Sequence, residues 1–187
     1  MSDRTSGPLD SIILVLGVIA WVAVILLILA LSVLVSFGAD LPDETLTPGA
    51  VRDDIGIEAL CTTKWGLDHR AVTSAMKREV MDLYRMTPQQ CPSGKIEIDH
   101  KISRELLGKD AVENLWPQCY EKPVRGLNPS ETAEWGAHKK DRLENRLHKE
   151  VCAVRMMDRA KALEAAQAEI SVDWIAAYKK RFGAWIP

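Results

Sequence analysis

The first feature of this 187-residue chain is a stretch that lacks charge, because no Asp, Glu, Lys, Arg or His occurs between Ser11 and Ala39. Residues 40–187 hold all but one of the 24 Lys and Arg residues and all but two of the 26 Asp and Glu residues. Neither sign of charge dominates there, which excludes a disordered charged tail and a strongly basic domain. The chain also lacks a repeat of fixed period, which excludes a solenoid, and a second long apolar run, which excludes a multi-span transporter.

The uncharged stretch predicts a membrane anchor. Residues 11–37 are almost entirely Leu, Ile, Val and Ala, and as a helix they would reach about 40 Å, more than a hydrocarbon core of about 30 Å. The alternatives are a signal peptide cleaved near residues 36–38 and a buried core helix. Acidic residues after the stretch favour a cytoplasmic N-terminus. We therefore expect a single-pass membrane protein whose C-terminal domain is extracytoplasmic, in the periplasm or at the cell surface.

Four parts are expected along the chain. A short flank (residues 1–10) and the transmembrane helix (11–37) precede a linker (38–57). Residues 40–57 of this linker contain two Pro and two Gly and show no periodicity. The remainder, residues 58–187, is expected to form one domain with a C-terminal helix.

Periodicity predicts an α+β fold for this domain. Apolar residues spaced by three and four predict helices over residues 68–84, 137–160 and 163–178. Alternation predicts a strand over residues 95–99, and a second hydrophobic stretch follows near residue 115. The positions expected to face the core are Val72, Ala75, Met76, Val80 and Leu83, then Leu143, Leu147, Val151 and Val154, and finally Leu163, Ala166, Ile170, Trp174 and Tyr178.

The four cysteines show no CxxC spacing, which favours two disulfides formed in an oxidising compartment. Four free thiols in a cytosolic domain and a zinc site made by all four remain as alternatives. Among the three pairings, we expect Cys61 with Cys152, which would join the ends of the domain. The second pair is then Cys91 with Cys119, on either side of the β region.

The residues that could do chemistry lie between the predicted strand and the helix that begins near residue 137. Asp99 and His100 end the strand, Asn114 follows a turn at Gly108, and His138 stands near the start of the helix. A carboxylate with two imidazoles is the set needed for one divalent metal ion and one general base.

This pattern resembles the HNH endonuclease family, and in particular small exported bacterial proteins with an HNH-like domain. The resemblance is carried by Asp99-His100, the Leu-Gly turn, the NLWPQ segment and the helix sequence AHKKDRLENRLH. It covers roughly residues 61–178 and implies a ββα-metal core flanked by helices. Lys109 follows Gly108 where the family usually has a second glycine, which predicts a different or strained turn.

The resemblance also implies residue roles. His100 matches the general base that takes a proton from the attacking water, and Asn114 matches the residue that braces the loop and orients the imidazole. Asp99 and His138 match the ligands of a divalent metal ion, Mg²⁺ or Zn²⁺. Further candidates for metal binding or support, on the same helix, are Asp141 and Asn145. We interpret His148 and His69 as surface or packing histidines.

The predicted function is that of a membrane-anchored, metal-dependent endonuclease acting on nucleic acid, on DNA rather than RNA. An excess of basic residues between His138 and Lys161 supports contact with phosphates. The alternatives are a catalytically silent extracytoplasmic binding or structural module and a hydrolase of another phosphate ester. No protein partner can be inferred.

Overall fold

The computed structural model describes Trp21, residues 40–65 and residues 69–183. The chain divides into two units, Met1–Phe37 and Gly38–Pro187, and the second contains the described fold. The helices and strands of this unit are α2 (Ile57–Leu60), α3 (Ser74–Tyr84), β1 (Ile96–His100), β2 (Leu115–Cys119), α4 (Ala137–Ala153) and α5 (Met156–Phe182). Four 3₁₀ turns lie between them: η1 (Pro88–Gln90), η2 (Arg104–Leu106), η3 (Val112–Asn114) and η4 (Pro129–Glu131).

Strands β1 and β2 form a two-stranded antiparallel sheet. Ile98 lies opposite Pro117, and His100 lies opposite Leu115. An isolated pair of strands is marginal in water, so this sheet depends on the elements that cover it. Helix α3 supplies one cover, because its Val80 packs in a small core with Ile98 and Leu115.

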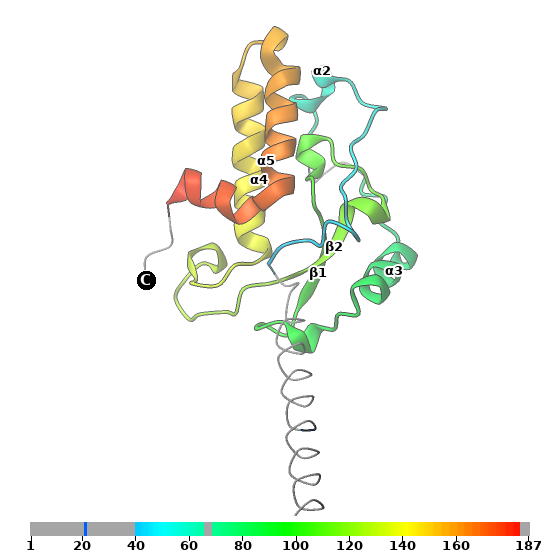
Figure 1. The fold of residues 1–187 in the computed structure, drawn as a ribbon. Coiled ribbons are helices and arrows are strands. Elements are labelled where there is room, and N and C mark those ends of the chain that lie inside the picture. The colour runs from blue at the N-terminus through cyan, green and yellow to red at the C-terminus, as the bar shows by residue number, and fades with distance from the viewer. Residues whose placement is uncertain (1–20, 22–39, 66–68, 184–187) are drawn as a thin grey trace, which may run out of the picture. The chain divides into compact units, whose positions relative to one another are not determined.

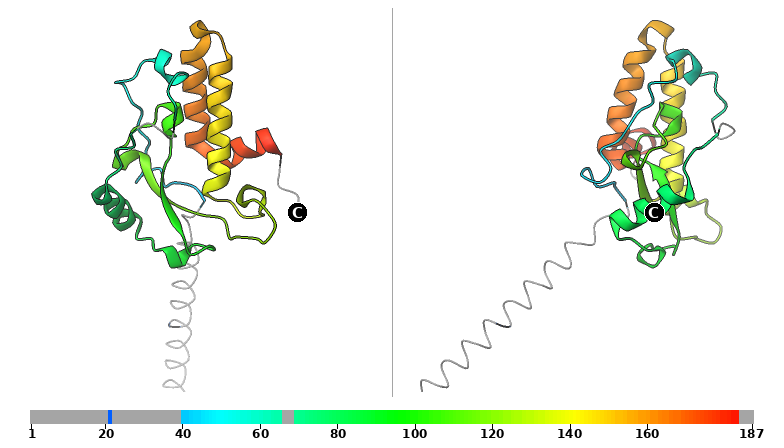
Figure 2. Two further views of the ribbon diagram at one scale, coloured as in Figure 1. Left: turned by 180° about the vertical axis from the view of Figure 1, so that it is seen from behind. Right: turned by 90° about the vertical axis from the view of Figure 1, so that its right-hand side faces the viewer.

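Helices α4 and α5 lie side by side and form the larger core (Figures 1 and 2). The predicted apolar stripes are buried as expected, except that Val154 is only partly buried. The predicted helix 137–160 is nevertheless wrong at its end, because Val154 and Arg155 have extended backbones and α5 begins at Met156. This reversal turns the two stripes toward each other, which buries apolar surface that one continuous helix would leave in water.

Helix α3 begins later than predicted. The side chain of Thr73 accepts a hydrogen bond from Met76 N (3.2 Å) and caps the N-terminus of the helix. The residues before Thr73 therefore do not belong to the helix. The predicted apolar face is also rotated, because Ala75 and Leu83 are exposed while Val80 is buried.

Part of the segment predicted as a linker belongs to the folded domain. Thr47 is buried, and its hydroxyl donates to Leu115 O (2.9 Å). Val51 forms a bridge with Gly108, and Lys109 N donates to Ala50 O (2.9 Å). The segment therefore runs along the loop that joins β1 to β2.

Both expected disulfides are confirmed. Cys61 is joined to Cys152, and Cys91 is joined to Cys119. The first bridge links the end of α2 to α4, and the second links the segment before β1 to the end of β2. Two disulfides are typical of a chain that folds in an oxidising compartment.

The prediction of a single-pass membrane protein with a cytoplasmic N-terminus is wrong for the part of the chain that the structure describes. Within the described residues, none of the helices combines the length and the apolar character needed to cross a bilayer. Apart from Trp21, the stretch 11–37 on which the prediction depended lies outside the described residues.

The α+β class is confirmed, but the prediction of a ββα-metal core is wrong. A long loop, residues 120–136, separates β2 from α4. The side chains expected to bind a metal ion are instead paired with other side chains. Asp99 pairs with Lys140, and His138 pairs with Glu121. In the described part of the chain these residues do not gather around a common point that could hold an ion.

The α4–α5 core gives a direct prediction for stability. Leu143 is fully buried in it, and Leu143→Ala should lower the free energy of unfolding by about 2–5 kcal/mol through lost burial and a residual cavity. Leu83→Ala is the matched control, because that side chain is 45% exposed and its loss should cost about 0.5 kcal/mol or less. Urea denaturation measures both, and similar costs would contradict the assigned core.

Candidate functional site

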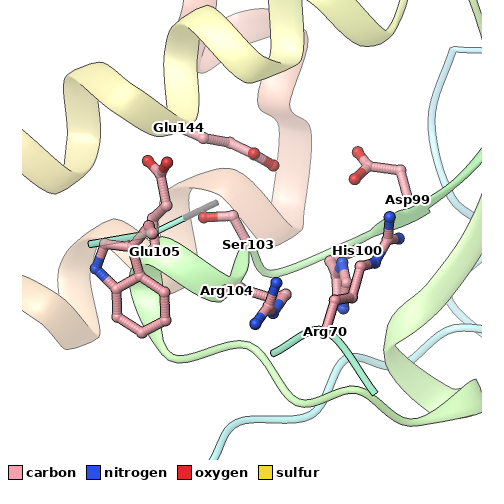
Figure 3. Close-up of a pocket in the computed structure, with 8 residues that line it drawn as sticks. Arg70, Asp99, His100, Ser103, Arg104, Glu105 and Glu144 are labelled. Carbon is pink, nitrogen blue, oxygen red and sulfur yellow. The ribbon is translucent and has the colours of Figure 1, made fainter. Parts of the chain in front are cut away.

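A cavity of about 140 Å³ lies beside the end of β1 (Figure 3). Two residues expected to act in chemistry, Asp99 and His100, line it. The other walls come from distant parts of the chain, since Arg70 precedes α3 and Glu144 belongs to α4. The complete lining consists of Trp65, Arg70, Asp99, His100, Ser103, Arg104, Glu105 and Glu144.

His100 is the buried imidazole of this cavity, with 4% of its surface exposed. Burial lowers its pKa to about 4, although the nearby carboxylates of Asp99 and Asp110 act in the opposite direction. The imidazole is therefore neutral at pH 7. Its Nε2 lies 2.7 Å from Asp110 Oδ1.

Asp110 determines the tautomer of this imidazole. Burial raises the pKa of Asp110, but hydrogen bonds from Ala71 N and His100 outweigh that effect and hold the pKa below its usual value. An ionised carboxylate can only accept, so His100 Nε2 carries the proton and donates it. Nδ1 then keeps a lone pair, which is the state required of a general base.

Asn114 holds the loop that follows His100. It is fully buried, and its Oδ1 accepts from Ile102 N (3.0 Å). Its Nδ2 donates to the carbonyl oxygens of Ile102 and Lys109 (both 3.0 Å). This amide thus joins the two ends of the loop, which is the bracing expected of it.

The turn within this loop has the left-handed residue at an unexpected position. Leu107 has a φ of 60°, whereas Lys109 is not in the positive region, so the turn differs from the predicted pattern and Lys109 is unstrained. Gly108 is required for another reason, because a Cβ there would lie 1.7 Å from Ile102 O.

Two polar groups of the cavity are buried without a hydrogen-bond partner among the described residues. They are Arg70 Nε and the hydroxyl oxygen of Ser103, whose residue is only 2% exposed. Arg70 NH2 does donate to Ile98 O (2.6 Å), so the guanidinium is held against β1. Unpaired buried donors are costly, and both residues line the cavity, where a ligand could satisfy them.

Asp99 is bound by a buried lysine. Lys140 Nζ donates to Asp99 Oδ2 (2.8 Å), to His100 O (2.6 Å) and, very closely, to Glu144 Oε1. Burial alone would lower the pKa of Lys140, but the charges of Asp99 and Glu144 raise it above its usual value. Lys140 therefore stays protonated, and the same ammonium holds the pKa of Asp99 below normal against the effect of burial.

His138 does not line the cavity. Its Nδ1 lies 2.7 Å from Glu121 Oε2, and the ring of Tyr120 packs against it at a tilt, with 5.0 Å between centroids. Glu121 is buried at the start of α4, where its other oxygen accepts from Lys139 N (3.0 Å). A carboxylate is favourable there because the N-terminus of a helix carries partial positive charge.

The two further candidates on α4 differ from each other. Burial of its carboxyl group, with added repulsion from Asp99 and Glu97, raises the pKa of Asp141 to about 7, although the side chain keeps contact with solvent. Asn145 is exposed and donates to Asp141 O within its own helix (2.9 Å). Asp141 thus lies among negative charges, and a bound cation would reduce the repulsion between them. The contacts of Asn145 indicate no binding site.

Metal-ligating side chains come together at a different place in the fold, near the C-terminal end of α4. Cys61, His148 and Cys152 have ligand atoms within 4.8 Å of one another, and the described residues contain no other group of three or more such His, Cys, Asp or Glu side chains. Cys61 and Cys152 form a disulfide, so neither sulfur is a thiolate. His148, interpreted from the sequence as a surface or packing residue, belongs to this cluster.

The basic residues of α4 do not form the phosphate-binding face suggested by their number. Lys139 and Lys140 are buried, and Lys139 donates to backbone oxygens of Thr132 and Glu134. Arg142 stacks over Phe182, and Arg146 pairs with Glu150. Most of these cations are therefore engaged within the protein.

Sequence reasoning missed most of the cavity wall. Arg104 begins the 3₁₀ turn η2, Asp110 lies in the loop beyond it, and Arg70 is separated from His100 by 30 positions, so no local pattern links them. Only the polar composition of the KDAVEN loop could have drawn attention to Asp110. Comparison of the chain with protein-family models, with curated proteins and with solved structures found no match.

The low pKa of His100 predicts how stability depends on pH. The pKa is about 4 in the folded chain and about 6.5 when unfolded, so the unfolded chain binds the proton first as pH falls. The stabilisation is therefore present above pH 6.5 and is lost between pH 6.5 and 4, by about 3 kcal/mol. His100→Asn lacks this titration, and the difference in unfolding free energy between the two chains should change across that range. Parallel pH profiles would contradict the prediction.

Proposed function

We propose that this chain hydrolyses phosphodiester bonds in nucleic acid, in DNA rather than RNA, with His100 as the general base. The observation that carries the proposal is the His100–Asp110 pair, which lies beside a cavity that also contains two arginine side chains. A neutral imidazole oriented by a carboxylate is suited to removing a proton from water. Guanidinium groups are suited to binding phosphate. The Asp99-His100 and Asn114 motifs, which resemble those of HNH endonucleases, point to the same chemistry.

The phosphate would be held by two donor atoms that have no hydrogen-bond partner among the described residues, although the Arg70 guanidinium also contacts Ile98 O and Glu97 through its other nitrogens. Arg70 Nε and the Ser103 hydroxyl are buried donors of residues that line the cavity, and phosphate oxygens would satisfy both. Arg104 also lines the cavity, although it lies 3.6 Å from Asp110 and is partly neutralised by it. Together these groups would stabilise the charge that develops on the phosphate oxygens.

The substrate itself would adjust the base. Besides burial, the positive charge of Arg70 contributes to the low pKa of His100. A bound phosphate would neutralise Arg70 and favour the imidazolium, raising the pKa toward neutral pH. His100 Nδ1 would then take a proton from water, the water oxygen would attack phosphorus, and the bond to the leaving oxygen would break. Asp110 would stabilise the resulting imidazolium.

A divalent cation, Mg²⁺ or Zn²⁺, is part of the proposal. The donor types fit such an ion, since Glu121 holds one nitrogen of His138 and leaves the other available, as is common for metal-ligating histidines. The raised pKa of Asp141 marks a place where positive charge is favourable. Asp99, Asp141 and His138 do not converge on one point in this structure, so they would have to move together to hold the ion, which would then stabilise negative charge on the phosphate.

Lys140 favours a second candidate function, that of a catalytically silent binding module. Its ammonium group occupies one oxygen of Asp99, which is the carboxylate expected to bind metal. If Lys140 holds Asp99 permanently, the cavity binds an anionic group without cleaving it. The two functions share the same phosphate contacts and differ in turnover.

Activity assays should separate these functions. His100→Asn should lower the rate of nicking of supercoiled DNA by about 10²–10⁴-fold, because it removes the proton acceptor. Binding of the same DNA, measured by fluorescence anisotropy, should change little, since Arg70 and Ser103 are intact.

The matched control is His69→Asn, because His69 is exposed and lines no part of the cavity. This variant should cut DNA like the wild-type chain. Single-stranded DNA, double-stranded DNA and RNA are compared in each assay, with EDTA as the blank. If the wild-type chain binds these nucleic acids but cleaves none of them, the hydrolase proposal is contradicted and the binding module remains.

The metal proposal has its own test. His138→Ala should raise the Mg²⁺ or Zn²⁺ concentration needed for half-maximal activity by about 10–100-fold, while activity at saturating metal is largely recovered. His69→Ala serves as the control for loss of an unrelated histidine. Activity that persists in EDTA would show that hydrolysis does not require the ion.

A further inference from the structure

The sulfur cluster at the opposite end of α4 from His138 has no role in the proposed reaction. His148 Nε2 lies 3.4 Å from Cys152 Sγ and 3.0 Å from Leu60 O. Cys61, the residue after Leu60, completes the disulfide with Cys152. All three side chains are half-buried, so small molecules in solvent can reach them.

Helix geometry and packing hold these donors together independently of the disulfide. His148 and Cys152 are four residues apart on α4 and therefore lie on the same face. Leu60 is fully buried in the same core as Leu147 and Val151, which keeps the neighbouring Cys61 close to α4. Breaking the S–S bond would thus leave two thiols and one imidazole near each other.

The donor set matches the preference of zinc. Two thiolates and an imidazole are common zinc ligands, and donors around a tetrahedral Zn²⁺ lie roughly 3.5–3.8 Å apart. The present separations, all within 4.8 Å, are compatible with that spacing after the sulfurs move apart. Water would supply the fourth ligand.

His148 can be released to bind a metal without leaving a buried acceptor unpaired. In the disulfide form its Nε2 donates to Leu60 O, since a carbonyl oxygen only accepts. Trp65 Nε1 donates to the same oxygen (2.9 Å). Leu60 O would therefore stay satisfied when the proton of His148 moves to Nδ1 and Nε2 turns to the ion.

The second disulfide lacks these properties. Cys91 and Cys119 are buried, and no third ligand accompanies them among the described residues. The chain thus contains its own control pair.

We infer that Cys61, His148 and Cys152 form a zinc site in the reduced chain. The disulfide abolishes this site, because it removes both thiolate ligands. A dithiol reduces the Cys61–Cys152 bond to two thiols and is itself oxidised to a disulfide. Zn²⁺ then binds both sulfurs and His148 Nε2, and the two thiol protons pass to solvent. In the reverse exchange a small-molecule disulfide takes up the two electrons and is reduced to two thiols, the Cys61–Cys152 bond forms again, and the ion is released.

The test measures metal binding by the full chain in both redox states. Zn²⁺ affinity is measured by competition with a chromophoric chelator, after reduction by a phosphine under nitrogen. Co²⁺ serves as a spectroscopic probe, because tetrahedral thiolate coordination gives intense visible bands. Circular dichroism of each sample follows the fold.

Four variants test whether Cys61, His148 and Cys152 are the ligands of the bound ion. Cys91→Ser with Cys119→Ser should keep one Zn²⁺ per chain and the Co²⁺ bands, whereas Cys61→Ser with Cys152→Ser should lose both. His148→Ala should weaken Zn²⁺ binding by at least about tenfold, while His69→Ala should leave it unchanged. The oxidised chain should bind no Co²⁺ through sulfur.

Several results would overturn the inference. These are Co²⁺ bands that persist without Cys61 and Cys152, unchanged affinity in His148→Ala, or a folded reduced chain that binds no Zn²⁺. A reduced chain that stays unfolded with and without Zn²⁺ would also overturn it. Refolding by Zn²⁺ that depends on His148 would support it.

Discussion

The buried ammonium group of Lys140 joins helix α4 to the end of strand β1, and the cavity depends on this contact. It donates to Asp99, to the backbone oxygen of His100 and to Glu144, and only 1% of its residue is exposed. A buried charge is costly when unpaired, so all three contacts are needed for Lys140 to remain there. The position of the His100 backbone, and with it the direction of the imidazole, follows from this arrangement.

A second set of hydrogen bonds holds the loop between the strands. Asn114 joins the ends of that loop from within, and Lys101 attaches it to the segment around Thr47 through its ammonium group. Asp110 is carried on this loop, and its carboxylate accepts a hydrogen bond from His100 Nε2. The imidazole is therefore positioned by polar contacts from several segments, while the apolar core lies mainly between α4 and α5.

Helix α4 connects two regions of different chemistry. Its first half contacts β1 and the cavity through Lys140 and Glu144, and its second half carries His148 and Cys152. The helix is held by the α5 packing along its length and by the disulfide to Cys61 near its end. A redox change at Cys152 would thus occur on the same helix that supports the cavity, about two turns from Glu144.

The sequence alone determined the elements that have strong local signals. The apolar spacing of Leu143, Leu147 and Val151 places them in the core, and the alternation around Ile98 predicts its strand. The cysteine pairing was also predicted correctly. Asp99 and His100, which were predicted as a metal ligand and a general base, both line the cavity, and their place at a strand end is visible in one segment.

Tertiary structure decided the rest, because the deciding contacts join residues distant in sequence. Arg70, Asp110 and Lys140 reach the end of β1 from three separate segments. No proline or glycine marks the helix break at Val154 in the sequence. The packing of α5 on α4 explains this break. Local patterns specify which residues prefer a helix, a strand or the interior, whereas the partner of each buried charge is set only when the chain is folded.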